Sequence, residues 1–290
     1  MHRWTGRKRA GMMADAPSGI AGIDHIIIGV RDLEAARHNW ARLGFTLTPR
    51  GRHIGQGTAN YCIMFARDYL ELLGFVARDE HAHRLEAFLA QREGAMSVAF
   101  APDRDAAATA AALTARELHP SAPRALGRAL ELPAGSVTPR FSLVTLPPDE
   151  TPGLDCFICG HLTPELVRRP EWLAHPNGVT GISAVHLVAE DPAALAPAYR
   201  RLFGDDRVAM TPRGIEADTG RNRLVFTRPA MSEANMPPPV IAAIELRIGS
   251  RAASEAYFRG AGVAFTALPD GRLALAPAEA NGTTLLLTEN

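Results

Sequence analysis

The chain has few cysteines, no net charge and no long apolar run, and each shortage excludes a class of protein. Three cysteines in 290 residues are too few for a disulfide framework and fit a reducing compartment. The formal net charge is zero, and the arginines are scattered, so they form no basic stripe that could follow a phosphate backbone. This argues against nucleic acid as a partner. No segment approaches the roughly 18 uninterrupted apolar residues of a membrane span, so we also expect no membrane partner.

The basic N-terminus, with Arg3, Arg7, Lys8 and Arg9, is not followed by an apolar run of signal-peptide length. Export is therefore not expected, and a cytoplasmic location is predicted. We interpret residues 1–20 as a disordered basic leader outside the fold.

A repeat runs along the rest of the chain. The segment GIDHIIIGVRDLEAARHNWARLGF predicts a strand rich in β-branched residues, followed by a helix that Asp32 caps and that ends at Gly44. Three strands are predicted after it, near 46–49, 60–66 and 69–76. This βαβββ pattern returns from Ala95, from Gly181 and from Val240, where Asp191 is expected to cap the third helix.

The repeat predicts an α+β fold with four βαβββ modules arranged as two paired domains. Each domain is expected to be a curved mixed sheet that encloses a cavity, with its helices outside. The predicted domains are residues 21–165 and 181–290, joined by a connector at 166–180. No GxGxxG follows the first strand, so dinucleotide binding is not supported.

The candidate site begins with His25 and Glu71. Alternation puts His25 on the face of Ile23 and Ile27, opposite Asp24, and it puts Glu71 among apolar neighbours in YLELLGF. A buried carboxylate is costly unless it is paired or bound to a metal. Imidazole and carboxylate on one cavity wall suit a divalent ion, although a hydrogen-bonded pair without metal explains them too.

The HIIIGVRDLEAA opening, the GRHIGQGTAN segment and YLELLG resemble the glyoxalase-like branch of the vicinal-oxygen-chelate superfamily. The resemblance implies that the first and fourth strands of a unit supply metal ligands, here His25 and Glu71. It implies a divalent ion, Zn, Ni, Mn or Fe, and a proton-transferring role for Glu71. It covers the N-terminal pair of modules, and the C-terminal pair only through the repeat.

The sequence departs from the family pattern in the second unit. Met96 or Val98 occupies the slot where a His or Gln ligand is expected, so the fourfold set is incomplete. The last strand of that unit ends at His161, which alternation from Cys159 turns to the same side. We expect His161 to be the third metal ligand, with a surface histidine as the alternative.

Two further polar residues lie in a glycine-containing segment. His53 and Asn60 are predicted to contact substrate at the cavity mouth, where Gly51, Gly55 and Gly57 permit a close loop. A tight turn without function explains the glycines equally well.

The second pair of modules has no copy of this site. Ala184 stands in the slot of His25, and His186 and Glu245 are expected to form an ordinary buried polar pair. We therefore expect this half to serve as scaffold or lid.

Three functions stay open. The first is a metal-dependent lyase or isomerase acting on a small vicinal-dioxygen substrate, which is the leading hypothesis. The second is an Fe(II)-dependent ring-cleaving dioxygenase on His25, His161 and Glu71. The third is a metal-free protein that binds a small molecule or confers resistance to it. A small-molecule substrate is the expected partner, and a homodimer stays open.

Overall fold

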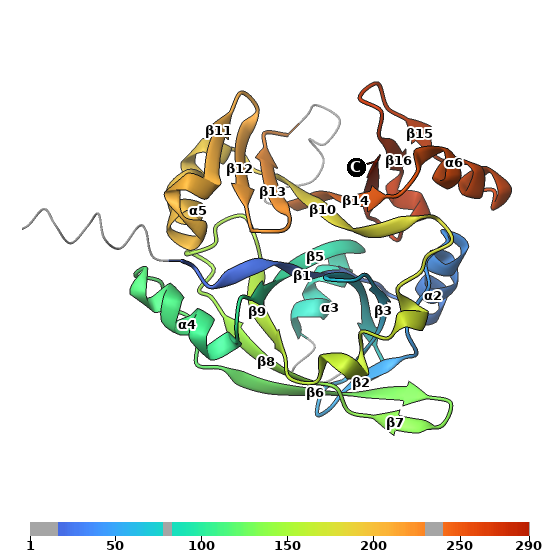
Figure 1. Ribbon diagram of the computed structural model, residues 1–290, viewed down its shortest axis with the longest axis horizontal. Coiled ribbons are helices and arrows are strands. Elements are labelled where there is room, and N and C mark those ends of the chain that lie inside the picture. Colours follow the sequence, from blue (N-terminus) through green and yellow to red (C-terminus); the bar gives the residue numbers. More distant parts are fainter. Residues whose placement is uncertain (1–16, 78–82, 230–239, 290) are drawn as a thin grey trace, which may run out of the picture.

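The first half of the chain closes into a barrel in this computed structural model, which describes residues 17–77, 83–229 and 240–289 (Figure 1). The strands follow the order β2-β3-β4-β1-β5-β9-β8-β6, and a pairing of β2 with β6 completes the ring. The first unit consists of β1 (Ile20–Gly29), α2 (Leu33–Arg42), β2 (Gly51–His53), β3 (Thr58–Met64) and β4 (Tyr69–Phe75). The second consists of β5 (Gly94–Pro102), α4 (Ala106–Ala115), β6 (Arg124–Leu132), β7 (Gly135–Val137), β8 (Arg140–Thr145) and β9 (Cys156–His161).

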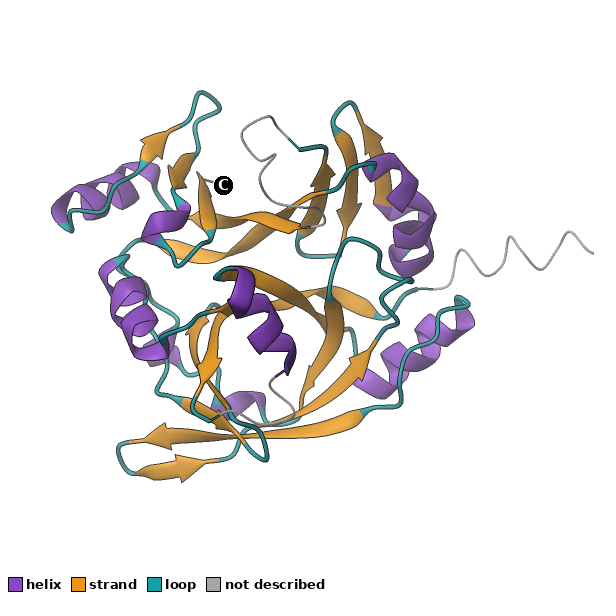
Figure 2. Cartoon of the chain, turned by 180° about the vertical axis from the view of Figure 1, so that it is seen from behind, coloured by secondary structure: helices purple, strands orange, loops and turns teal. Residues whose placement is uncertain are grey.

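The first helix of the barrel begins where the sequence predicts, and an aspartate caps α4 as well. The side chain of Asp32 accepts a hydrogen bond from the backbone N–H of Ala35 at 2.9 Å, and Asp105 caps α4 through Ala108 at 2.7 Å. Between the two units, α3 (His83–Gln91) lies across one end of the barrel (Figure 2).

The strand predicted at 46–49 does not form. The N–H of Thr46 donates to Nδ1 of His175 at 3.0 Å. Thr48 donates its N–H to the carbonyl of Cys62 in β3 at 2.8 Å, so the segment contacts β3 at Thr48 without forming a strand at 46–49. The strand that follows α2 is the shorter β2, whose pairing with β6 closes the barrel. His175 of the connector therefore holds the chain after α2, through the N–H of Thr46 and the carbonyl of Met64.

The second half forms an open sheet in the order β11-β12-β13-β10-β14-β17-β16-β15. Its third unit consists of β10 (Val179–Val188), α5 (Ala196–Phe203), β11 (Val208–Thr211), β12 (Gly214–Asp218) and β13 (Arg223–Thr227). Its fourth consists of β14 (Val240–Ile248), α6 (Arg251–Gly260), β15 (Thr266–Ala267), β16 (Leu273–Leu275) and β17 (Thr284–Glu289). Asp191 makes no capping hydrogen bond, contrary to the prediction, because a 3-10 turn at Pro192–Leu195 precedes α5. The α+β class and the four repeated modules are confirmed.

The two sheets pack back to back through β1 and β5 of the barrel and β10 and β14 of the open sheet (Figures 1 and 2). Ile26, Ile28, Val185, Leu187 and Ile244 lie in one hydrophobic cluster that spans both halves. One face of β1 is therefore committed to this core, which leaves its other face for the barrel interior.

Polar contacts fix the same junction. The buried amide of Asn222 accepts from the N–H of Ile23 at 2.8 Å and donates to the carbonyl of Ile182 at 2.7 Å. Asp68, also buried, accepts from the N–H of Ile182 at 3.0 Å. Backbone groups of β1 and β10 are thus satisfied by side chains from neighbouring segments.

Within residues 17–77, 83–229 and 240–289, every helix is too short or too polar to cross a membrane.

Replacing Asn222 with Ala should lower the free energy of unfolding by about 3 kcal/mol, because the N–H of Ile23 and the carbonyl of Ile182 lose their partners inside the junction. Urea unfolding measures the loss. As a control, the change of the exposed Gln91 to Ala should cost less than about 1 kcal/mol. Equal, small losses in both variants would show that Asn222 does not hold the halves together.

Candidate functional site

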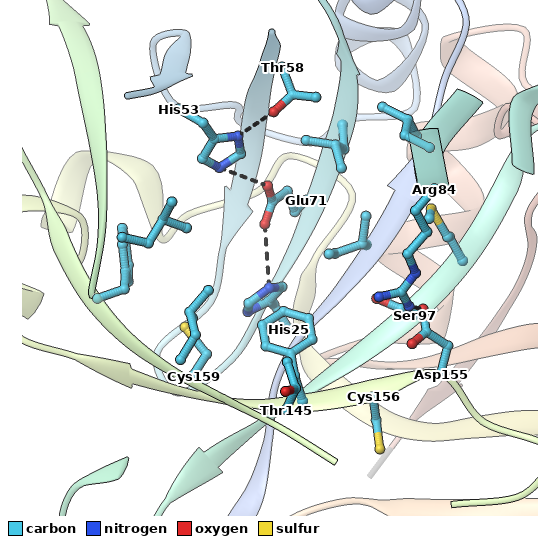
Figure 3. A pocket seen from close by; sticks show the side chains of 18 of the residues that line it. His25, His53, Thr58, Glu71, Arg84, Ser97, Thr145, Asp155, Cys156 and Cys159 are labelled. Carbon is cyan, nitrogen blue, oxygen red and sulfur yellow. Dashed lines mark hydrogen bonds and ion pairs between the residues drawn. The ribbon is translucent and has the colours of Figure 1, made fainter. Parts of the chain in front are cut away.

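A cavity of about 520 Å³ lies inside the barrel. Inward-facing side chains of the ring strands line it, and Arg84 and Leu85 of α3 close one side. Titratable groups gather in two places (Figure 3). One is the wall that carries His25 and Glu71, and the other is the ion pair of Arg84 with Asp155 near the opposite side.

A β-bulge in β1 sets the geometry of His25. The pairing of β1 with β5 shifts between Ile23 and His25, so the extra residue Asp24 interrupts the alternation. Ile23 consequently faces the inter-sheet core, and the Asp24 Oδ2 atom lies 2.8 Å from His25 Nδ1. The sequence prediction was wrong on both neighbours, since it set Asp24 opposite His25 and Ile23 beside it. Plain alternation cannot anticipate a bulge.

Glu71 reaches His25 as the sequence predicts, with His25 Nε2 and Glu71 Oε2 3.4 Å apart. The other carboxylate oxygen, Oε1, accepts a hydrogen bond from Asn60 Nδ2 at 2.7 Å and lies 3.8 Å from His53 Nε2. Thr58 holds the far side of the His53 ring, with its Oγ1 atom 2.8 Å from Nδ1. The structure therefore brings together the predicted residues His25, His53 and Glu71 on the first unit's strands (Figure 3), with Asn60 hydrogen-bonded to Glu71.

Electrostatics favours an ionised Glu71. Burial alone would raise its pKa, but the neighbouring His25 and His53 and the charge of Arg128 hold that pKa below its ordinary value. Burial lowers the pKa of His53, against the attraction of Glu71, which favours the neutral ring. At neutral pH Glu71 thus offers a carboxylate and His53 an uncharged imidazole.

The donor set of His25 and Glu71 fits a cation. The carboxylate of Asp24 only accepts hydrogen bonds, so Nδ1 of His25 carries a proton, and Nε2 presents a lone pair whenever it carries none itself. That lone pair faces Glu71 Oε2, another acceptor, across 3.4 Å. Either a shared proton or a metal ion satisfies both atoms, and a carboxylate behind the histidine is the usual support of a metal-bound imidazole.

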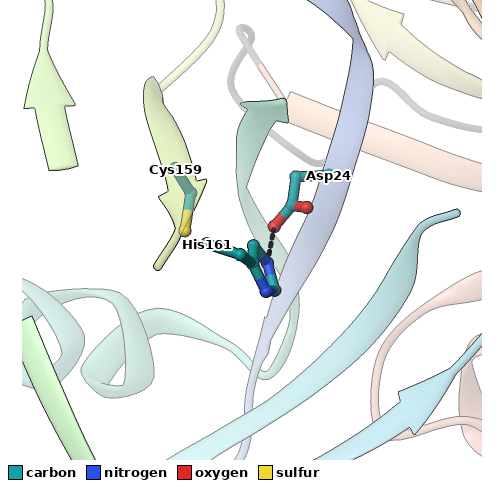
Figure 4. Close-up of side chains that lie close together, drawn as sticks. All are labelled: Asp24, Cys159 and His161. Atoms are coloured by element: carbon teal, nitrogen blue, oxygen red, sulfur yellow. Dashed lines mark hydrogen bonds and ion pairs between the residues drawn. The ribbon is translucent and has the colours of Figure 1, made fainter. Parts of the chain in front are cut away.

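His161 does not join this pair. Its Nε2 lies 3.0 Å from Asp24 Oδ2, and its ring packs against Phe141 and Tyr69. It reaches His25 only through the shared oxygen of Asp24, because the bulge has turned that carboxylate between the two rings. Among the described residues, the group of three side chains close enough to hold an ion is Asp24, Cys159 and His161 (Figure 4).

The second unit contributes no further imidazole or carboxylate beside Glu71. Val98 lies in the inter-sheet core, and the wall of β5 beside His25 carries Ser97 and Ala99. On β9, Phe157 packs edge-on against the His25 ring with centroids 5.6 Å apart. At the β5 positions beside His25 the structure thus places Ser97 and Ala99, and neither offers the histidine or glutamine ligand of the family pattern.

Sequence reasoning missed Arg128, a buried residue of the cavity wall. Its Nη1 donates to Asn60 Oδ1 at 3.2 Å and contacts Cys62 Sγ at 2.9 Å. Gly51 permits this crossing, because a Cβ there would lie against Asn60 Oδ1 and 2.5 Å from Arg128 Cδ. The available signal was the alternation in RALGRALEL, which sets Arg124, Leu126 and Arg128 on one face.

In the open sheet, His186 and Glu245 form the hydrogen-bonded pair that the sequence suggests, with Nε2 and Oε2 3.0 Å apart. Arg272 Nη1 donates to the same oxygen at 2.8 Å. The hydrogen bond from His186, with that from Arg272, lowers the pKa of Glu245 to about 2 against the opposing effect of burial. This cluster satisfies its own charges.

A model of the glyoxalase-like domain family matches residues 23–203, which is more than half of the chain. The chain belongs to the glyoxalase-like domain family. The predicted resemblance to the vicinal-oxygen-chelate superfamily is thereby confirmed. Members of this superfamily usually bind a divalent metal and include metal-dependent isomerases and dioxygenases. A search among curated proteins finds no match.

Solved structures share the fold at low identity. A hypothetical protein from Staphylococcus aureus is 11% identical with a TM-score of 0.67, over 92% of this chain and 99% of that one. A mutant of 4-hydroxymandelate synthase from Streptomyces coelicolor is 13% identical with a TM-score of 0.60, over 93% of each chain. A fusion of a xylose isomerase-like barrel with 4-hydroxyphenylpyruvate dioxygenase is 13% identical with a TM-score of 0.54, over 94% of this chain and 49% of that one.

The pKa of Glu245 predicts how stability depends on pH. A carboxyl group whose pKa is 4.5 ordinarily and about 2 when folded stabilises the fold above pH 4.5, and this contribution disappears as the pH falls toward 2. Urea unfolding of the Glu245→Gln variant should show a loss on the order of 2 kcal/mol at pH 7 and a shallower decline in acid than the unaltered protein. The exposed Glu190→Gln is the control.

As scaffold, the same cluster should not affect metal content. His186→Ala is expected to destabilise the protein at pH 7 by about 1–3 kcal/mol and to leave bound metal unchanged. A His186→Ala protein of normal stability that has lost its metal would contradict the scaffold role.

Proposed function

We propose that this protein is a glyoxalase-like, metal-dependent lyase or isomerase that acts on a small vicinal-dioxygen substrate in the barrel cavity. The observation that carries the proposal is the facing pair of His25 Nε2 and Glu71 Oε2 at 3.4 Å, with Asp24 behind the histidine. Both groups line the same cavity, whose volume of about 520 Å³ suits a small molecule.

Each residue of the pair has a role in this proposal. His25 and Glu71 would hold a divalent ion, and such an ion supplies Lewis-acid polarisation of two adjacent substrate oxygens. Glu71 takes a proton from the carbon beside the substrate carbonyl and gives it to the carbonyl carbon, while the hydroxyl proton passes through solvent to the former carbonyl oxygen. Its ionised state at neutral pH, which His25 and His53 favour, equips it to act as the base.

The surrounding residues orient this carboxylate. Asn60 donates one N–H to Glu71 Oε1, and its amide nitrogen lies 3.4 Å from Nε2 of His53. With Nε2 accepting, Nδ1 of His53 donates to Thr58. His53 then stays neutral at the cavity wall and can accept or donate a hydrogen bond to a substrate hydroxyl after a small movement. We assign His53 and Asn60 to substrate positioning.

The two other functions have weaker support. The dioxygenase hypothesis needs His161 beside His25 and Glu71, and His161 instead bonds to Asp24. A metal-free binding protein is favoured by one observation, namely that Ser97, Ala99 and Phe157 face the site where further ligands would be needed. Metal analysis separates this alternative from the enzyme.

The purified protein should contain a divalent metal, and the variants His25→Ala and Glu71→Gln should each weaken its binding at least about tenfold. His161→Ala should weaken it less, because His161 acts on His25 through Asp24. Mass-spectrometric metal analysis and titration with Zn, Ni, Mn and Fe measure the effect, with the exposed His38→Ala as the matched control. Metal retained in His25→Ala would refute the assigned ligands, and equal losses in His161→Ala and His25→Ala would make His161 a ligand.

Activity is tested on hydroxyacetone in heavy water. We expect metal-dependent exchange of its carbon-bound protons, followed by NMR, and a loss of at least about a hundredfold in Glu71→Gln. Exchange that survives in Glu71→Gln would mean that another group is the base.

A further inference from the structure

Arg128 is a buried cation that makes no direct ion pair among the described residues, and the buried carboxylate of Glu71 lies beyond the intervening amide of Asn60. It is 3% exposed and lines the cavity, yet no carboxylate among the described residues lies within ion-pair distance of its guanidinium. Its Nη1 is satisfied by Asn60 and Cys62, and its buried Nε has no hydrogen-bond partner in the part of the chain that is described. Because arginine stays protonated in proteins, this charge cannot be relieved by losing a proton.

The surroundings hold the guanidinium in place. It lies over the ring of Phe141, 5.5 Å from the centroid, and its stem crosses Gly51, where no side chain obstructs it. A planar, fixed guanidinium matches a carboxylate in geometry as well as in charge. The site is thus built for one kind of group, at a position that the cavity can reach.

Arg128 is also tied to the proposed base. Asn60 accepts from Arg128 through Oδ1 and donates to Glu71 through Nδ2, so one amide separates the two groups. A small molecule can therefore contact both at once. Leu126 lies next to Arg128 on the same face of β6, and Leu143 adds apolar wall on β8, which suits a short hydrocarbon body.

We propose that Arg128 anchors the carboxylate of the substrate, so that the cavity selects a small carboxylic acid with a short apolar body over neutral carbonyl compounds. This inference rests on the proposed function, since it assumes that substrate occupies the same cavity. Arg124, which follows the same face of β6 toward the exterior, would attract the acid as it enters.

A purely structural Arg128 makes a different prediction. If the residue only bridges β6 to β3 through Asn60 and Cys62, a carboxylate gains nothing over its neutral amide. Hexanoate and hexanamide differ in this group alone, and isothermal titration calorimetry of the unaltered protein distinguishes the two roles without any substitution.

We expect hexanoate to bind at least about tenfold more tightly than hexanamide, the gain typical of a charge-assisted hydrogen bond in a desolvated site. Arg128→Gln should abolish the difference, Arg128→Lys should retain part of it, and Arg140→Gln, a charge lost from the adjacent strand β8 outside the cavity, should leave it unchanged. Equal affinities in the unaltered protein, a preference that survives Arg128→Gln, or no hexanoate binding at millimolar concentration would each overturn the proposal.

A chelator-treated sample separates this inference from the proposed function. A preference for hexanoate that persists without metal assigns the carboxylate to Arg128, even if metal analysis refutes the enzyme. A preference that disappears with the metal assigns the carboxylate to the ion and overturns the role of Arg128. Inorganic phosphate that displaces hexanoate at lower concentration would show that the site takes phosphate instead.

Discussion

The arrangement of His25, Glu71 and His161 in the barrel depends on one buried carboxylate, that of Asp24. Burial opposes its ionisation, yet the charges and hydrogen bonds of His161 and His25 hold its pKa well below the ordinary range. Its Oδ2 accepts from both rings, and Oδ1 lies 3.4 Å from Arg168 Nη2. The proton of His25 is thereby fixed on Nδ1, and the opposite nitrogen is free to face Glu71. The ion site proposed for His25 and Glu71 follows from that orientation.

The bulge that turns Asp24 inward belongs to the fold and not to the site alone. In the open sheet, β10 shifts its pairing with β14 between Ile182 and Ala184, at the equivalent place. Ser183 stands there in the slot of Asp24, and Ala184 in that of His25. The same backbone irregularity therefore turns Asp24 toward His25 in one half and carries Ser183 and Ala184 in the other. The repeat keeps the backbone geometry in both halves, and the side chains at these two slots differ.

The sequence predicted the features that depend on strand alternation. Its predictions were wrong where contacts between residues distant in the sequence determine the structure. Strand alternation brought His25 and Glu71 to one wall, because both lie in strands buried on two faces. The position of Asp24 depends on a bulge, and in the predicted strand at 46–49 the N–H of Thr46 is bound by His175, more than a hundred residues away. Neither leaves a local pattern. Alternation in β6 could have predicted that Arg128 faces the cavity. Its burial follows from the pairing of β2 with β6 that closes the barrel, and sequence periodicity does not predict that pairing.

The two groups that could hold an ion are not independent, because Asp24 serves both. An ion held by Asp24, Cys159 and His161 would need a thiolate, and burial raises the pKa of the Cys159 thiol well above its ordinary value. Such an ion would also compete with His25 and His161 for the oxygen that now accepts from both. His25 would then lose the partner that fixes its tautomer, and its lone pair would no longer be held toward Glu71. Occupation of the Asp24 group therefore weakens the His25 and Glu71 pair, so the barrel is expected to hold its ion at one of the two positions and not at both.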